Sequence, residues 1–209
     1  MKWEALRSFA ARRPFFREAD LHAGRGAAPA ELVQLSLWVR EGRLLRLRKG
    51  YYALAGNDPS ARTPLLALAE PLYRPSYVSL EWALNHYGLI PDSPGSVTCV
   101  TTLKTARFDT PLGTVAYRHV SPRFFFGFSK TEKPAPCWIA SREKALLDFF
   151  HLSIPKSIAP DPKQLLANYR LQNLGTVRKA RLKEMMRKFG DPRVEEWGKS
   201  CLLAMKMEA

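Results

Sequence analysis

Residues 42–54 have the sequence GRLLRLRKGYYAL, and they constrain the fold more than any other stretch of the chain. Lys49 and Gly50 predict a two-residue β-turn, because glycine easily adopts the positive φ angle that such a turn requires. Leucines and arginines precede this turn, and two tyrosines follow it. The pattern is typical of two antiparallel strands, so we predict a β-hairpin.

The position of the turn predicts which side chains share a face of the hairpin. Arg48 pairs with Tyr51, and Leu47 pairs with Tyr52 when the register continues without a break. One face then carries the apolar side chains of Leu45, Leu47, Tyr52 and Leu54. The other face carries the side chains of Arg46, Arg48 and Tyr51. The sequence therefore predicts a hairpin with one apolar face and one basic face.

Helical patterns precede the hairpin. The spacing of apolar residues predicts helices over residues 2–11, 17–23 and 29–41. Three helices followed by a hairpin is the order of elements in a winged helix-turn-helix. Turn-forming residues at 56–63 predict a linker after the hairpin. We therefore expect a winged helix-turn-helix DNA-binding domain over residues 1–60 and a second domain over residues 61–209.

The second domain mixes helical and strand patterns. Helices are expected over residues 65–70, 79–87 and 141–151. Ser79 and Ser141 are expected to cap the second and third of these helices at their N-terminal ends. Runs of β-branched and aromatic residues predict strands over residues 97–102, 106–108, 114–120, 124–128 and 138–140. The fold class is therefore α+β: the winged domain is followed by a mixed α/β domain with a small, largely antiparallel sheet flanked by helices.

The charge of the chain indicates a polyanionic partner. Lysine and arginine number 33 against 19 acidic residues, which gives a net charge of +14, and the cations are spread along the chain. A folded protein of this charge often binds nucleic acid, although solubility alone is the simpler explanation. Three widely spaced cysteines favour a reducing cytoplasm over a disulfide framework. We expect no signal peptide and no membrane span.

The third predicted helix, 29–41, is the candidate for reading DNA bases. Leu32, Leu35, Trp38 and Val39 form its predicted inward stripe. The outward side chains are then Gln34, Leu37 and Arg40. Glutamine can pair with adenine, arginine with guanine or phosphate, and leucine with a thymine methyl group. The hairpin would add phosphate contacts from Arg43, Arg46, Arg48 and Lys49, and a sugar contact from Tyr51.

A second basic region lies near residues 177–189. Its cations are Arg178, Lys179, Arg181, Lys183, Arg187 and Lys188. Apolar residues at helical spacing accompany them, so the region predicts an amphipathic helix with one solvated face. A second nucleic-acid surface is the alternative, and the sequence leaves both open.

Enzymatic chemistry has little support in the sequence. The histidines are isolated, the cysteines lack the paired spacing of a metal site, and no phosphate-binding loop is present. Asp92, Asp109 and Asp148 could converge in the fold, which would suit a metal-dependent nuclease with a winged domain. We expect instead a protein that is not an enzyme and that has no cofactor and no metal.

Five segments together resemble one protein family. They are WVREGRLLRLRKGYYAL, YVSLEWALNHYGLIP (77–91), FDTPLGTVAYRHV (108–120), FFFGF (124–128) and IASREKALLDFFHL (139–152). In this order they resemble the AbiEi family of antitoxins, bacterial transcriptional regulators that are paired with a nucleotidyltransferase toxin. The resemblance covers most of residues 1–152. Ser141, Glu143, Lys144 and Asp148 would then cap and order a core helix.

The resemblance implies a function. It implies a cytoplasmic repressor that binds inverted repeats in the double-stranded operator DNA of its own operon, as a homodimer or as cooperative monomers. It also implies that the C-terminal domain opposes the toxin of a type IV toxin–antitoxin system without a tight complex. A stand-alone winged-helix transcription factor with an effector or oligomerisation domain is the alternative.

Overall fold

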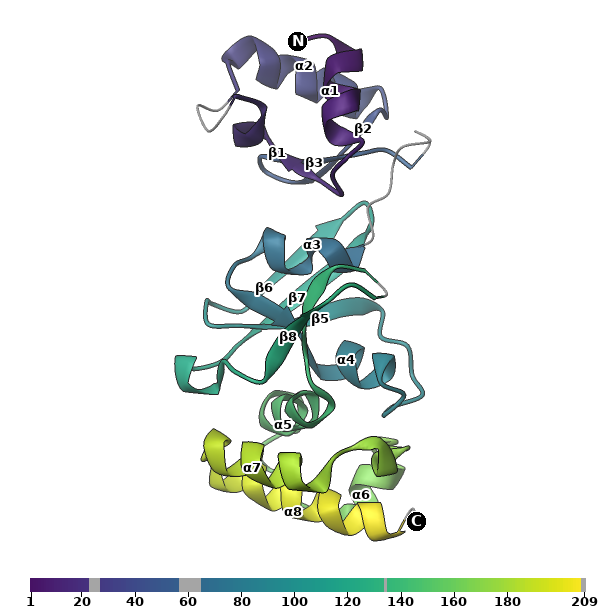
Figure 1. The fold of residues 1–209 in the computed structure, drawn as a ribbon, viewed down its shortest axis with the longest axis vertical. Coiled ribbons are helices and arrows are strands. Elements are labelled where there is room, and N and C mark those ends of the chain that lie inside the picture. The colour runs from purple at the N-terminus through teal and green to yellow at the C-terminus, as the bar shows by residue number, and fades with distance from the viewer. Residues whose placement is uncertain (23–26, 57–64, 134, 208–209) are drawn as a thin grey trace.

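A computed structural model of the chain describes residues 1–22, 27–56, 65–133 and 135–207. A small N-terminal region lies at one end of an elongated molecule, a six-stranded sheet occupies the middle, and a layer of helices closes the other end (Figure 1). The expected linker, 56–63, lies outside the described residues except for Gly56.

The N-terminal region has the elements of a winged helix-turn-helix, as predicted. Its helices and strands are α1 (Trp3–Ala10), β1 (Phe16–Arg17), the 3-10 helix η1 (Glu18–His22), α2 (Pro29–Arg40), β2 (Leu44–Arg48) and β3 (Tyr51–Leu54). The strands form an antiparallel sheet in the order β1-β3-β2. We refer to the β2–β3 hairpin as the wing.

The predicted second helix, 17–23, is wrong in its first residues. Phe16 and Arg17 pair with β3 as a short strand, and the 3-10 helix begins only at Glu18. Asp20 accounts for this late start of the helix. Its carboxylate accepts hydrogen bonds from the backbone N–H of Arg17 at 2.8 Å and from the Arg17 guanidinium. The same contacts lower the pKa of Asp20 below its usual value. A local side-chain bond therefore replaces the first helical turn.

The C-terminal region contains most of the chain. Its elements are α3 (Leu65–Leu72), β4 (Ser76–Val78), α4 (Leu80–His86), β5 (Ser96–Thr101), β6 (Ala106–Thr110), β7 (Gly113–His119), the 3-10 helix η2 (Pro122–Phe124), β8 (Phe128–Thr131), β9 (Cys137–Ala140), α5 (Arg142–Leu152), α6 (Pro162–Ala167), the 3-10 helix η3 (Leu174–Thr176), α7 (Lys179–Phe189) and α8 (Pro192–Met207). The sheet order is β6-β7-β5-β4-β9-β8. The β5–β7 and β4–β9 pairs are parallel, and the pairs β6–β7, β4–β5 and β8–β9 are antiparallel. The α+β fold class is thus confirmed.

Two strand assignments differ from the sequence prediction. The predicted strand 124–128 is wrong, because Phe124 ends the 3-10 helix η2 and stacks on Phe189 at 4.3 Å between ring centroids, and strand β8 begins only at Phe128. Strand β4 was not predicted, although it lies near the centre of the sheet. Ser76, Tyr77 and Val78 are all buried, so this short strand has no alternation of apolar and polar residues to reveal it.

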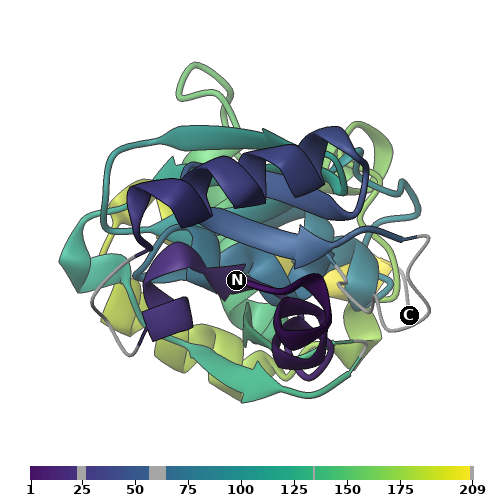
Figure 2. The same cartoon turned by 90° about the horizontal axis from the view of Figure 1, so that it is seen from above.

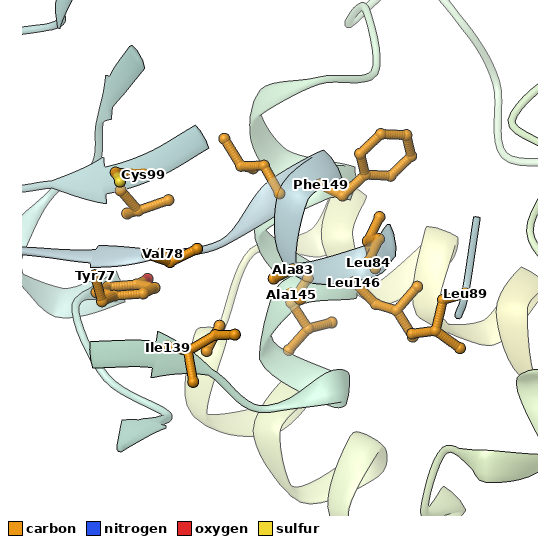
Figure 3. Packing of buried hydrophobic residues seen from close by; sticks show 14 of the residues in the cluster. Tyr77, Val78, Ala83, Leu84, Leu89, Cys99, Ile139, Ala145, Leu146 and Phe149 are labelled. Atoms are coloured by element: carbon orange, nitrogen blue, oxygen red, sulfur yellow. The ribbon is translucent and has the colours of Figure 1, made fainter. Parts of the chain in front are cut away.

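Helix α5 forms the centre of the larger core. Figure 3 shows Ala145, Leu146 and Phe149 of this helix facing Ala83 and Leu84 of α4. The sheet contributes Val78, Cys99 and Ile139 to the same cluster. On its other side α5 packs against α7 and α8. The helix therefore joins the sheet to the layer of helices at the C-terminal end.

A buried ion pair lies on α5. Lys144 and Asp148 are fully buried and form a salt bridge one helical turn apart. Asp148 also accepts hydrogen bonds from the hydroxyls of Tyr77 at 2.9 Å and Ser79 at 2.7 Å. Ser141 caps the helix as predicted, since its hydroxyl accepts from the backbone N–H of Lys144. The predicted side-chain cap at Ser79 is wrong, because its hydroxyl is used in this network.

The cysteines Cys99, Cys137 and Cys201 are all buried. In the part of the chain that the structure describes, no helix is both long enough and apolar enough to cross a membrane.

Candidate nucleic-acid interface

Helix α2 is anchored in the N-terminal region by one face. Pro29 occupies its first turn, and the Glu31 carboxylate accepts from the backbone N–H of Ala28 at 3.0 Å, which satisfies a donor at the start of the helix. Leu35 and Trp38 are buried, and the Trp38 ring packs edge-on against Trp3 with centroids 5.2 Å apart. The opposite face of α2 is turned away from the C-terminal region (Figures 1 and 2).

The exposed face of α2 differs in part from the prediction. Leu37 is 40% exposed and Arg40 is exposed, as expected, whereas Gln34 is half-buried. Leu32 was predicted to face inward, but it is 38% exposed. The small core under α2 reaches Leu35 and Trp38 and does not extend to the first turn of the helix. Val33, which the sequence prediction did not select, is 61% exposed.

The register of the wing is the main correction to the sequence prediction. Arg48 pairs with Tyr51 as predicted, but Arg46 pairs with Tyr52, and a bulge at Leu47 separates the two pairs. A bulge adds one residue to one strand, so side chains beyond it change face. Arg46 and Arg48 therefore lie on opposite faces of the wing, and the predicted division into an apolar and a basic face is wrong.

Arg46 lies on the face of the wing that carries the core of the N-terminal region. Its partner Tyr52 is buried in that core together with Leu44 and Leu54. Strand β2 is the edge strand of the three-stranded sheet, and it lies beside α2. Arg46 itself is exposed at this edge. The edge position therefore leaves the Arg46 guanidinium accessible on the α2 side of the wing.

Arg48 and Tyr51 face the C-terminal region. The Arg48 guanidinium donates a hydrogen bond to the carbonyl oxygen of Leu72 in α3. It also lies 5.1 Å from the ring centroid of Phe108 in β6 and 4.9 Å from that of Tyr51. The Tyr51 ring stacks on Phe15 at 6.1 Å. Arg48, one of the eight residues predicted to bind DNA, thus contacts the other half of the molecule, and Tyr51 packs against the larger core.

The remaining wing cations are accessible. Arg43 forms an ion pair with Glu41 at 3.1 Å, and its guanidinium lies 5.3 Å from the Trp3 ring centroid, with 46% of the side chain exposed. Lys49 is exposed in the turn, where Gly50 has the expected positive φ of 76°. The accessible predicted cations of α2 and the wing are therefore Arg40, Arg43, Arg46 and Lys49.

The second basic region is helix α7, at the far end of the molecule from α2 (Figure 1). Leu182, Met185, Met186 and Phe189 bury one side of it. Its exposed cations are Arg178, Lys179, Lys183, Arg187 and Lys188. Arg181 is instead half-buried and lies 3.6 Å from Glu143 of α5. The helix is amphipathic, as predicted.

The three aspartates considered for a nuclease site do not form one. Asp92 pairs with Arg170 at 2.7 Å, and Asp109 bonds to Arg107 and Thr114. Asp148 is enclosed in its buried ion pair. Among the residues that the structure describes, no three histidine, cysteine or acidic side chains are grouped to hold a metal ion.

Comparison with known proteins gives a result for the N-terminal region. No curated protein matches the chain. Residues 4–55, which run from α1 to the end of the wing, match the model of a family described as "Transcriptional regulator, AbiEi antitoxin". The match confirms the predicted resemblance for the N-terminal segment, residues 38–54, and supports a role as an antitoxin and transcriptional regulator. Residues 4–55 of this chain are thus similar to the AbiEi antitoxin family of transcriptional regulators.

Proposed function

We propose that the chain is a transcriptional repressor of its own operon and the antitoxin of a cytoplasmic type IV toxin–antitoxin system. The observation that carries the proposal is the exposed face of α2 beside the edge strand that bears Arg46, within a region that matches the AbiEi model. In a winged helix-turn-helix, this helix enters the major groove and the wing contacts the backbone. The net charge of +14 favours such a polyanionic partner.

Each of the eight residues selected from the sequence has a role in this proposal. Gln34 pairs with adenine, Leu37 contacts a base edge, and Arg40 binds guanine or phosphate. Arg43, Arg46 and Lys49 contribute phosphate contacts. Arg48 and Tyr51 hold the wing against the C-terminal region and so position the other cations. Inverted repeats would be bound by a homodimer or by two cooperative monomers.

We also propose a functional division into residues 1–60 and 61–209. The N-terminal region has its own small core, and the C-terminal region has a much larger one. The first part would bind operator DNA. The second would counteract the nucleotidyltransferase toxin without forming a tight complex with it.

Operator binding is tested by fluorescence anisotropy with DNA from upstream of the gene, over a series of salt concentrations. Arg46→Ala should weaken binding to all sequences and reduce the slope of log K against log salt by about 0.9 for one phosphate contact. Lys163→Ala, at an exposed position of α6, is the matched control and should keep the wild-type slope. An unchanged slope for Arg46→Ala would contradict the proposal that Arg46, on the edge strand of the wing, contacts a DNA phosphate.

Antitoxin activity is tested by co-expressing the full-length protein with a nucleotidyltransferase encoded beside it. Wild type and Arg46→Ala should both restore growth, while Arg46→Ala should repress a reporter driven by the operon promoter less strongly than the wild type does. This result would separate toxin neutralisation from DNA binding in an intact protein. Failure of the wild type to restore growth would remove the antitoxin role and favour the stand-alone regulator.

A further inference from the structure

The outer face of α2 exposes three large apolar side chains. Val33 is 61% exposed, Leu37 is 40% exposed and Leu32 is 38% exposed. Of the eight large hydrophobic side chains exposed among the described residues, these three lie on one helix of 12 residues. Contiguous exposed apolar side chains usually mark an interaction surface. We therefore expect this face of α2 to bind a partner that presents apolar groups.

Val33 and Leu37 form the centre of this surface. They are four residues apart, so their side chains lie on the same side of the helix, and Arg40 follows Leu37 by three residues. Gln34 lies next to Val33 and is half-buried. Because Arg40, Arg43 and Arg46 are exposed at the end of α2 and on the adjacent strand, an apolar stripe here adjoins a group of cations.

The charge of these surroundings argues against a second copy of the chain as the partner. Two molecules of net charge +14 would repel each other if they met at a surface flanked by arginines. A stable protein interface also buries about 800 Å² on each partner, which three side chains do not provide. A polyanion that presents small apolar groups fits better. In the major groove of DNA, the apolar group is the 5-methyl of thymine.

We propose that Val33 and Leu37 recognise thymine methyl groups, and that the operator half-site therefore carries A·T pairs where the middle of α2 lies. Gln34, between them in the sequence, would bind the adenine of such a pair. Specificity in this arrangement comes from methyl contacts supported by one amide, while the arginines supply affinity. The inference rests on the proposed DNA-binding function, and it identifies the base pairs which that surface recognises.

The test removes the methyl groups and leaves base pairing intact. The wild-type protein is titrated with the footprinted duplex from upstream of its gene, made with thymine or with uracil in the half-sites. Burial of one methyl group contributes about 0.8 kcal/mol, so each lost contact should weaken binding about fourfold. Val33→Ala with Leu37→Ala should bind the two duplexes equally, with an unchanged salt slope. Leu203→Ala, which changes an exposed leucine on α8, should discriminate as the wild type does.

Several results would overturn the inference. Equal wild-type affinity for both duplexes, with specific binding retained, would exclude methyl recognition but leave the DNA-binding function intact. A Val33→Ala, Leu37→Ala protein that still discriminates would assign the effect to DNA shape. Conversion of a wild-type dimer to a monomer by this double substitution would assign the stripe to contacts between copies. A wild type that binds no DNA at all would instead contradict the proposed function itself.

Discussion

The guanidinium of Arg48 donates a hydrogen bond to the carbonyl oxygen of Leu72, and this contact ties the wing to helix α3 of the C-terminal region. The same guanidinium lies over the rings of Tyr51 and Phe108, which come from the two halves of the molecule. Arg46, two residues earlier, is exposed on the opposite face of the wing. Two arginines that look equivalent in the sequence therefore have different surroundings.

This difference predicts that two single substitutions change the stability of the fold by unequal amounts. Arg48→Ala should lower the free energy of unfolding by about 1.5–3 kcal/mol, because it removes a charged donor from a part-buried carbonyl group. Arg46→Ala should change that free energy by less than about 0.5 kcal/mol, as is usual for exposed positions. Urea unfolding followed by circular dichroism measures both values. Equal effects of the two substitutions on stability would show that Arg48 does not anchor the wing in solution.

The burial of Leu47 predicts that the N-terminal and C-terminal regions unfold cooperatively. This bulged residue is 3% exposed and belongs to the core of the C-terminal region, whereas its neighbour Leu44 belongs to the N-terminal core. Because the wing takes part in both cores, calorimetry of the wild type should show one transition. Leu47→Asp would place a carboxylate between the halves and should split the transition into two. Two transitions already present in the wild type would contradict this coupling.

The sequence predicts the helices and strands of the winged region well. It predicts less well which face of the wing each side chain occupies. Gly50 and the run of leucines and arginines identify the wing, because turn chemistry is local. The bulge at Leu47 depends on distant contacts, since Leu47 lies in the larger core and Arg48 contacts α3 and β6. Only knowledge of the C-terminal region would have revealed it. The prediction that Arg48 and Tyr51 contact DNA beside Arg46 assumed that the two strands of the wing pair without a bulge.

Similar limits apply elsewhere in the chain. Strand β4 is buried on both faces and only three residues long, so it has no periodicity to detect. Leu32 matches a helical apolar stripe, yet the core beneath α2 is too small to cover it. Ser79 has the sequence context of a helix cap, but the buried Asp148 carboxylate engages its hydroxyl. For Ser79, a long-range contact thus overrides a correct local preference.

His151 predicts how stability depends on pH. Burial lowers the pKa of its ring below the usual 6.5, although the nearby carboxylates of Asp191 and Asp148 partly oppose this. Between the lowered pKa and 6.5, the unfolded chain binds a proton that the folded chain does not, so stability increases as pH rises through this range. Burial acts in the same direction on His86.

Acidification from pH 7.5 to pH 5.5 should therefore lower the urea midpoint of the wild type. His151→Gln removes one of the two rings whose pKa burial lowers and should reduce this difference. The carboxylate of Asp20, whose pKa is lowered from 3.8 mainly by its hydrogen bond to Arg17, acts only at lower pH. A His151→Gln variant with the full wild-type pH dependence would show that the ring is not responsible.

The Lys144–Asp148 pair predicts strong non-additivity between two substitutions. Both side chains are fully buried, and burial lowers the pKa of Lys144 even though Asp148 favours its charged form. Lys144→Met would leave a buried carboxylate with only the Tyr77 and Ser79 hydroxyls as donors, at an expected cost of about 3–5 kcal/mol. Asp148→Leu would leave a buried ammonium group among aromatic rings and should cost a similar amount.

The double variant Lys144→Met, Asp148→Leu should regain much of this loss, because apolar side chains of similar size replace both charges and no unpaired charge remains. Tyr77→Phe is the matched control: it removes one donor to Asp148 and keeps both charges, so it should cost about 1.5–3 kcal/mol, less than either charge substitution. Urea unfolding of the four variants and the wild type gives the coupling energy directly. If the two single losses simply add in the double variant, the pair does not stabilise the core as a unit, and Lys144 and Asp148 must each be compensated by other groups.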